Sequence, residues 1–283
     1  MKRLPDYLKR GIINTESTKA VRSILKDKCL NTVCESARCP NKNECYSKNT
    51  ATFLIMGTTC TRNCRFCNIT TGKPPRLDEN EPLHIAEAVK ELNLKYVVIT
   101  SVTRDDLEDQ GSSHFAKIIS AIRKTSPKVR IEVLTPDFQG KQELVDIVLR
   151  AQPDVFNHNI ETVPHLYPKA RPQAIYRRSL DVLSYIKSIN QKVLTKTGMM
   201  VGLGETKDQI IQVFKDLKEI SCDIVTIGQY IQPTKEHLEV ERYYEPSEYE
   251  ELTLIAKEIG IKYTFFSPLA RSSYKALEVF SDT

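Results

Sequence analysis

The amino-acid sequence predicts an α/β fold in the form of a partial (β/α)6 barrel of the TIM type. From residue 51 onward, short β-branched or apolar runs alternate with amphipathic segments, which is the pattern of consecutive βα units around a parallel sheet. Six such runs occur, fewer than the eight strands of a closed barrel. We find no internal repeat and no low-complexity tract, which argues against solenoid folds and disordered tails.

The predicted strands are bounded by polar residues, and helical periodicity appears between them. Apolar residues recur every three or four positions over 85–92 and 210–217, which predicts helices that cover the sheet. A final helix is predicted over 247–259, and Gly260 suits the position after its carboxyl end, where a left-handed backbone is common. The six runs are Thr52 to Gly57, Tyr96 to Thr100, Arg130 to Leu134, Asp154 to His158, Lys192 to Val201 and Asp223 to Gly228.

Charge and hydropathy argue against two classes of partner. Lys and Arg number 41 and Asp and Glu 36, interspersed along the chain, so the sequence does not favour nucleic acid. No apolar run reaches the roughly 18 residues of a membrane span, and the start MKRLPDYLKR lacks the apolar core of a secretory signal. We therefore expect a soluble, cytoplasmic protein without a membrane partner.

The cysteines are concentrated in one part of the chain. Seven of the eight lie between Cys29 and Cys67, and only Cys222 stands apart. Dense cysteines in an intracellular protein of this size more often bind metal or perform redox chemistry than form disulfides.

One cysteine triplet follows the first predicted strand directly. Cys60, Cys64 and Cys67 form a C-x3-C-x2-C motif on one short loop. A structural zinc site usually has four protein ligands, whereas a four-iron cluster with three thiolates leaves one iron open for a small molecule. The ligand number thus favours an iron-sulfur cluster, with zinc as the alternative.

With Phe66 before its last cysteine, this motif resembles the signature of the radical S-adenosylmethionine (SAM) superfamily. That superfamily places its cluster on the loop after the first strand of a partial barrel. The resemblance implies that Cys60, Cys64 and Cys67 hold a [4Fe-4S] cluster that binds SAM.

A second triplet lies before the first βα unit. Cys34, Cys39 and Cys45 are spaced C-x4-C-x5-C, so they need a further ligand or leave an iron open. A zinc knuckle completed by Cys29 is the alternative, because Cys29 lies only five residues before Cys34. Spacing alone does not decide between the two.

Two triplets in this order resemble the lipoyl synthase family, and further matches extend over almost the entire chain. The resemblance implies a second, auxiliary [4Fe-4S] cluster, completed by a serine of the motif Arg271-Ser-Ser-Tyr274: Ser273, with Ser272 as the alternative. It also implies three parts, namely an N-terminal extension (1–50) that holds the auxiliary cluster, a radical SAM barrel (51–260) and a C-terminal segment (261–283) that returns to the extension. The other matching segments are 98–107, 156–163, 202–206 and 228–234.

The candidates for SAM contacts lie at strand ends. The segment 198–205 resembles the superfamily element beside the SAM adenine, with Met200 and Gly202 in the pattern. Lys196 is the candidate partner of the SAM carboxylate, and Thr100 replaces groups that hold the SAM amino group in many members. Uncharged and acidic side chains pair with hydroxyl and ammonium donors, and His158 is the histidine best placed to face the pocket. The candidates of that kind are Asn157, Asn159 and Glu161.

The resemblance implies a sulfurtransferase reaction. A 5'-deoxyadenosyl radical made from SAM abstracts hydrogen from an octanoyl chain, and the auxiliary cluster supplies sulfur for carbons 6 and 8. The octanoyl group is attached to a lysine of a lipoyl-carrier domain, as in glycine-cleavage H protein or the acyltransferase subunits of 2-oxo-acid dehydrogenases. A flavodoxin- or ferredoxin-like protein would donate electrons. The alternatives are a biotin-synthase-like radical SAM sulfurtransferase, against which the upstream triplet argues, and a zinc-stabilised binding module without catalysis.

Overall fold

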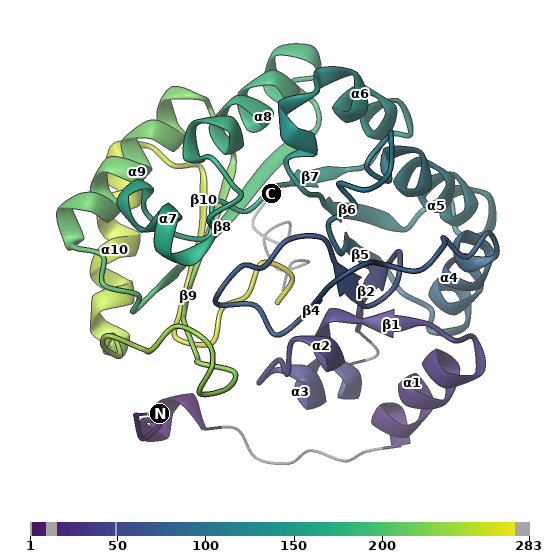
Figure 1. Ribbon diagram of the computed structural model, residues 1–283, viewed down its shortest axis with the longest axis horizontal. Coiled ribbons are helices and arrows are strands. Elements are labelled where there is room, and N and C mark those ends of the chain that lie inside the picture. Colours follow the sequence, from purple (N-terminus) through teal and green to yellow (C-terminus); the bar gives the residue numbers. More distant parts are fainter. Residues whose placement is uncertain (1, 10–15, 49, 275–283) are drawn as a thin grey trace. The chain divides into compact units, whose positions relative to one another are not determined.

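The computed structural model, drawn in Figure 1, describes residues 2–9, 16–48 and 50–274. The chain divides into two compact units. Unit 1 comprises Met1–Lys9, Asn63–Cys67 and Phe156–Thr283, and unit 2 comprises Arg10–Arg62 and Asn68–Val155. The loop of residues 60–67, here called the cysteine loop, passes from unit 2 into unit 1 after Arg62.

Unit 2 is built on three parallel strands, β2 (Thr52–Ile55), β5 (Tyr96–Ser101) and β6 (Arg130–Leu134). The short strand β1 (Asn31–Thr32) pairs antiparallel with β2. Helices α4 (Glu81–Glu91), α5 (Ser112–Thr125) and α6 (Gln142–Arg150) follow the strands and bury one apolar face each, as expected for βα units (Figure 1). The remaining elements are α1 (Glu16–Asp27), α2 (Val33–Ser36), α3 (Lys42–Ser47), η2 (Phe138–Gly140) and a separate parallel pair, β3 (Thr59–Cys60) with β4 (Thr70–Thr71).

Unit 1 has the same construction. Strands β8 (Leu194–Val201), β9 (Ile224–Gln229) and β10 (Tyr263–Phe266) are parallel neighbours. Their helices are α8 (Tyr176–Ile189), α9 (Lys207–Glu219) and α10 (Pro246–Ile259), and Val213, Phe214 and Leu217 of α9 are fully buried. The shorter elements are η1 (Asp6–Leu8), η3 (Pro164–Leu166) and α7 (Tyr167–Ala170), and β7 (Val155–Asn157) lies where unit 2 gives way to unit 1.

The structure confirms all six predicted strands. The first ends at Ile55, two residues before the predicted end, because Met56 and Gly57 have φ angles of 65° and 91°, which no strand residue adopts. The predicted final helix is α10, and Gly260 follows it with φ 96°. Strand β10, which is parallel to β9, was not predicted. It is only four residues long and half buried, so it carries no periodicity to distinguish it.

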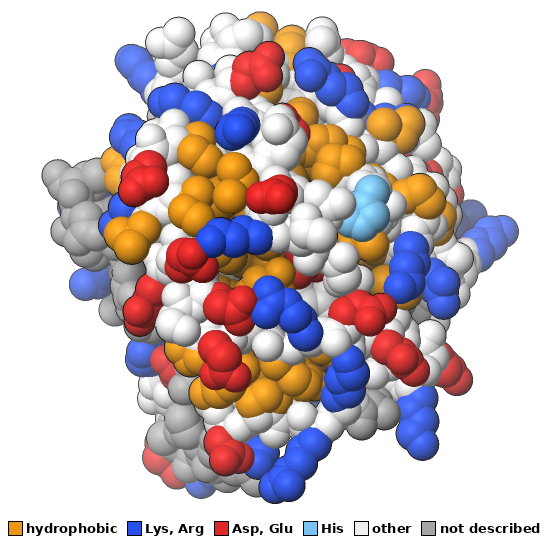
Figure 2. Space-filling model, turned by 90° about the vertical axis from the view of Figure 1, so that its left-hand side faces the viewer, with side chains coloured by type: hydrophobic (Ala, Val, Ile, Leu, Met, Phe, Trp, Pro, Cys, Tyr) orange, Lys and Arg blue, Asp and Glu red, His pale blue; other side chains and the backbone are white. Residues whose placement is uncertain are grey.

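The structure can be compared with two expectations from the sequence, one about surface charge and one about membrane-spanning helices. Lys and Arg side chains alternate with Asp and Glu over the face in Figure 2. Among the described residues, no helix combines the length and the apolar character needed to cross a membrane. Residues 275–283 of the predicted C-terminal segment lie outside the described residues.

Candidate functional site

The first half of the cysteine loop is held by unit 2. Cys60 ends β3, and two backbone N–H groups donate to its sulfur, from Arg62 at 3.4 Å and from Thr103 at 3.3 Å. Thr103 follows β5, and its carbonyl accepts a hydrogen bond from the Thr61 hydroxyl at 3.0 Å. Hydrogen bonds to a cluster sulfur orient the ligand and tune its electron density, so this geometry suits a metal-binding thiolate.

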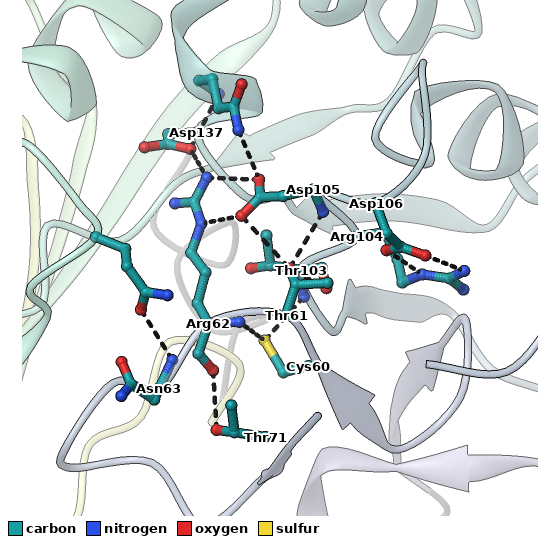
Figure 3. A network of polar contacts seen from close by, with 12 residues as sticks. Cys60, Thr61, Arg62, Asn63, Thr71, Thr103, Arg104, Asp105, Asp106 and Asp137 are labelled. Carbon is teal, nitrogen blue, oxygen red and sulfur yellow. Dashed lines mark hydrogen bonds and ion pairs between the residues drawn. The ribbon is translucent and has the colours of Figure 1, made fainter. Parts of the chain in front are cut away.

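A buried arginine fastens this half of the loop to two strand ends (Figure 3). Arg62 donates from Nε and Nη2 to the two carboxylate oxygens of Asp105, at 2.7 and 2.9 Å, and from Nη2 to Asp137 at 2.7 Å. Asp105 follows β5 and Asp137 follows β6, and Asp137 is fully buried. Burial alone would lower the pKa of Arg62, but the bonds from both carboxylates raise it overall, so the side chain stays charged.

The second half of the loop is held by unit 1. Arg65 donates its N–H to the carbonyl of Ala170 at 2.8 Å, and its own carbonyl accepts from the N–H of Leu238 at 3.0 Å. His237 donates from Nε2 to the carbonyl of Cys67 at 2.9 Å, while its Nδ1 lies 2.8 Å from the hydroxyl of Thr234. Because a carbonyl only accepts, Nε2 carries the proton that is donated to Cys67.

The upstream triplet lies within unit 2, on two short helices and the turn between them. Cys34 lies on α2, Cys45 on α3 and Cys39 in the turn between them, where the N–H of Cys39 donates to the carbonyl of Cys34 at 3.1 Å. Burial raises the pKa of the Cys34 thiol to about 12, and repulsion from Cys39 adds to that rise. Burial likewise raises the pKa of Cys45 to about 12, with repulsion from the other two thiols. Iron ions would relieve this repulsion, so the donor set fits an iron-sulfur cluster.

The zinc alternative depended on Cys29. This residue is exposed and lies after the end of α1. In the part of the chain that the structure describes, no three His, Cys, Asp or Glu side chains converge on a point as closely as one metal ion requires. A four-iron cluster allows wider spacing, because each thiolate binds a different iron.

Strand β8 presents the predicted SAM contacts on one face. Met199 and Val201 belong to the apolar core of unit 1, so Lys196 and Gly198 lie on the opposite face by the two-residue period of a strand. Met200 shares their face by the same period, but it also packs against the core. Lys196 is 1% exposed, which is unusual for a lysine and typical of one that has an interaction partner, as this one has.

Gly202 follows β8 in a conformation that requires glycine. Its φ is 98°, and a Cβ there would lie 2.1 Å from Nε2 of Gln229. The Glu205 carboxylate accepts from the N–H groups of Gly202 and Leu203, at 2.6 and 2.9 Å, which holds this turn closed.

The other predicted contacts differ in their burial and in the hydrogen bonds that their side chains make. Thr100 is buried on β5 and donates its hydroxyl to the carbonyl of Leu134 at 3.1 Å. Asn157 is fully buried at the end of β7. Burial raises the pKa of Glu161, although Arg171 and Asn159 oppose that rise. His158 is buried, and its Nε2 lies 3.0 Å from the hydroxyl of Ser179 on α8.

The two candidate serines occupy different environments. The hydroxyl of Ser272 donates to Oδ1 of Asn159 at 2.9 Å. Ser273, half buried beside it, makes no hydrogen bond to another described residue.

Sequence reasoning missed the residues that hold the cysteine loop. Arg62, Asp105 and Asp137 meet only in three dimensions, and the available signal was the position of both aspartates directly after strands. His237 belongs to no motif of the sequence, and nothing in its sequence position indicates a contact with Cys67.

Comparisons with known proteins agree with this geometry. The family model of the Radical SAM superfamily matches residues 54–217. A lipoyl synthase of Caldicellulosiruptor saccharolyticus is 52% identical over 97% of this chain and 96% of its own, and one of Caldanaerobacter subterraneus subsp. tengcongensis is 51% identical over the same shares. The crystal structure of methylornithine synthase has a TM-score of 0.52 at 14% identity, over 96% of this chain and 90% of that one.

The structural likeness bears on the fold, and it supports the predicted partial barrel with its mostly parallel sheet. The sequence identity bears on the family, because half of all residues agree over nearly the full length. This chain therefore belongs to the lipoyl synthase family of the radical SAM superfamily, whose members use SAM and two [4Fe-4S] clusters to insert sulfur.

Proposed function

We propose that this chain inserts two sulfur atoms, at carbons 6 and 8, into an octanoyl group carried on a protein lysine. The proposal is supported by the two cysteine triplets, each of which is held by a different set of residues. The cysteine loop is held by the Arg62 network and by His237, and the upstream triplet gathers three thiols on α2, α3 and the turn between them.

The two triplets have different roles in this proposal. Cys60, Cys64 and Cys67 would hold the cluster that binds SAM, and Cys34, Cys39 and Cys45 the cluster that provides sulfur. When bound, SAM and its cluster would supply the 5'-deoxyadenosyl radical, and the auxiliary cluster would supply the sulfur atoms. The chain contributes the N–H groups of Arg62 and Thr103, which orient the Cys60 sulfur.

Ser273 is the serine that we assign as the fourth protein ligand of the auxiliary cluster. Two observations support it over Ser272: the Ser272 hydroxyl is engaged by Asn159, and the Ser273 hydroxyl is not engaged by any described residue. An oxygen ligand is harder than a thiolate and a poorer match for a soft cluster, so it is released easily when the cluster gives up sulfide.

We assign the SAM contacts to strand-end residues of the barrel. Lys196 would pair with the SAM carboxylate, since its ammonium is buried on the same face as Gly198 and Met200. Glu161 would accept from the amino group or the ribose. The remaining assigned contacts are Thr100, Asn157, Met200 and Gly202.

Family membership implies a lipoyl-carrier protein as the substrate. We further propose glycine-cleavage H protein and the acyltransferase subunits of 2-oxo-acid dehydrogenases as carriers, and a flavodoxin- or ferredoxin-like electron donor. Cysteines gathered in metal-binding motifs suit a reducing compartment, so we assign the reaction to the cytoplasm.

The test begins with anaerobic reconstitution. We expect about eight irons per chain, as two four-iron clusters require, with matching sulfide. An octanoyl-lysine peptide with SAM and reductant should give 5'-deoxyadenosine and dithiolated peptide. Zinc without iron would contradict the proposal, and SAM cleavage without sulfur transfer would point to another substrate.

Variants then separate the triplets. Cys39→Ser should lose about half of the iron and all sulfur transfer, while Cys29→Ser, at an exposed thiol, should keep both. Ser273→Ala should impair sulfur transfer more than Ser272→Ala does. A larger loss in Ser272→Ala would reverse the assignment of the ligand.

A further inference from the structure

A chain of three side chains links the C-terminal serine motif to strand β8 within unit 1. The Ser272 hydroxyl donates to Oδ1 of Asn159 at 2.9 Å, and Nδ2 of Asn159 donates to the Glu161 carboxylate at 3.1 Å. The two contacts assign the orientation of the Asn159 amide, because only its oxygen can accept from a hydroxyl and only its nitrogen can donate to a carboxylate.

The backbone around Asn159 is held on both sides. Arg171 donates from Nη1 to the carbonyl of Asn159 at 2.9 Å, and this arginine is itself buried. Glu161 exchanges two hydrogen bonds with β8, from its N–H to the carbonyl of Gly198 at 2.9 Å and from the N–H of Met200 to its carbonyl at 2.8 Å. Asn159 therefore offers Ser272 an acceptor whose position is determined by the sheet.

Gly198 lies against the hydrogen bond between Ser272 and Asn159 and leaves room for it. A Cβ on Gly198 would lie 2.6 Å from the Ser272 hydroxyl, 2.8 Å from that of Thr226 and 2.9 Å from Oδ1 of Asn159. No real Cβ approaches polar atoms so closely, so the missing side chain at residue 198 is what lets Ser272 reach Asn159.

We propose that Asn159 is a positioning residue, which seats Ser272 on β8 and so presents the neighbouring Ser273 for ligation. This inference rests on the proposed function, because it assumes that Ser273 binds the auxiliary cluster. It assigns different roles to the two serines: Ser272 holds the segment against β8, and Ser273 is the cluster ligand. It also gives Gly198 a reason to be glycine that is independent of SAM.

The test uses the reconstituted protein and two measurements besides turnover. One is the rate at which a chelator removes iron from the auxiliary cluster, and the other is hydrogen exchange of the amides of residues 271–274. Asn159→Ala and Ser272→Ala should each raise both rates about threefold to tenfold, as expected for the loss of one neutral hydrogen bond. The double variant should match the single ones, because both remove the same bond.

Two further variants serve as controls. Ser272→Thr keeps the hydroxyl and should restore the wild-type rates, which a purely steric role of Ser272 would not predict. Ser188→Ala, at an exposed serine on α8, should behave like the wild type. If Asn159→Ala does not fold, the comparison of Ser272→Ala with Ser272→Thr still tests the same hydrogen bond.

The outcomes distinguish this inference from the proposed function. Full iron content with wild-type rates in both alanine variants would overturn the positioning role alone. Additive effects in the double variant would overturn it as well. If the wild-type protein itself holds only about four irons, both the function and the positioning role fail.

Discussion

Replacing Arg62 by lysine tests whether the Arg62 network holds the cysteine loop. The guanidinium makes three hydrogen bonds to two carboxylates, at 2.7 to 2.9 Å. A lysine keeps the charge, but its ammonium is a single point on a flexible stem and cannot reproduce the two-pronged contact with Asp105. We expect it to keep one of the three bonds.

The magnitude follows from the two bonds that are lost. A hydrogen bond to a charged group contributes about 1.5–3 kcal/mol, but Asp105 is partly solvated, which lowers the value on that side. Asp137 is fully buried, so the loss of a charged donor there costs more than at a solvated carboxylate. Together these give a loss of about 2–4 kcal/mol in the free energy of unfolding of unit 2.

Urea unfolding of the cluster-free chain under reductant, followed by circular dichroism, measures this loss as a lower midpoint at unchanged slope. Arg65→Lys is the matched control, because Arg65 lies in the same loop with an exposed side chain. It should change stability by less than about 0.5 kcal/mol. Equal midpoints for the two variants would refute the idea that the buried ion pairs hold the loop.

Three further predictions concern other parts of the two units. Glu161→Gln should become more stable relative to the wild type as pH rises. Burial raises the pKa of Glu161, so the neutral carboxyl stabilises the wild-type fold below its unfolded pKa, and this contribution is lost as the group ionises. The free energies of unfolding of the two proteins, measured from about pH 4 to 8, should diverge, and parallel curves would contradict the prediction. Gly111→Ala should destabilise unit 2 by about 2–4 kcal/mol, because φ is 85° and the new Cβ would lie 2.3 Å from Sδ of Met56; a thermal midpoint within a degree of the wild type would argue against that contact. His237→Ala should speed chelator removal of iron from the SAM-binding cluster about threefold to tenfold, since the Cys67 carbonyl loses its donor; unchanged rates would mean that the backbone bonds of Arg65 suffice.

Part of the candidate site was predictable because its chemistry is local. Each triplet lies within a dozen residues, so ligand type and number can be read from the chain without knowing the fold. The strands were predictable for a similar reason, since burial between helices produces continuous apolar runs. Met56 and Gly57 show the limit, because the left-handed turn that ends β2 left no mark in the apolar pattern.

His158 and Asn159 show why the rest required the structure. Both follow β7 and both are polar, yet one points toward Ser179 on α8 and the other toward Ser272, which lies 113 residues away in the chain. Which face a side chain takes depends on the register of neighbouring strands, and that register is a property of the assembled sheet.

The sequence by itself determined the family, the two cysteine triplets and the α/β class, because these depend on residue type, short spacings and apolar periodicity. Only the tertiary structure decided that Arg62 bridges the ends of β5 and β6, that His237 supports Cys67, and that Ser272 is engaged while Ser273 is not. The physical reason is that hydrogen bonds and ion pairs act over about 3 Å between atoms whose separation along the chain is arbitrary, so only the folded backbone brings them together.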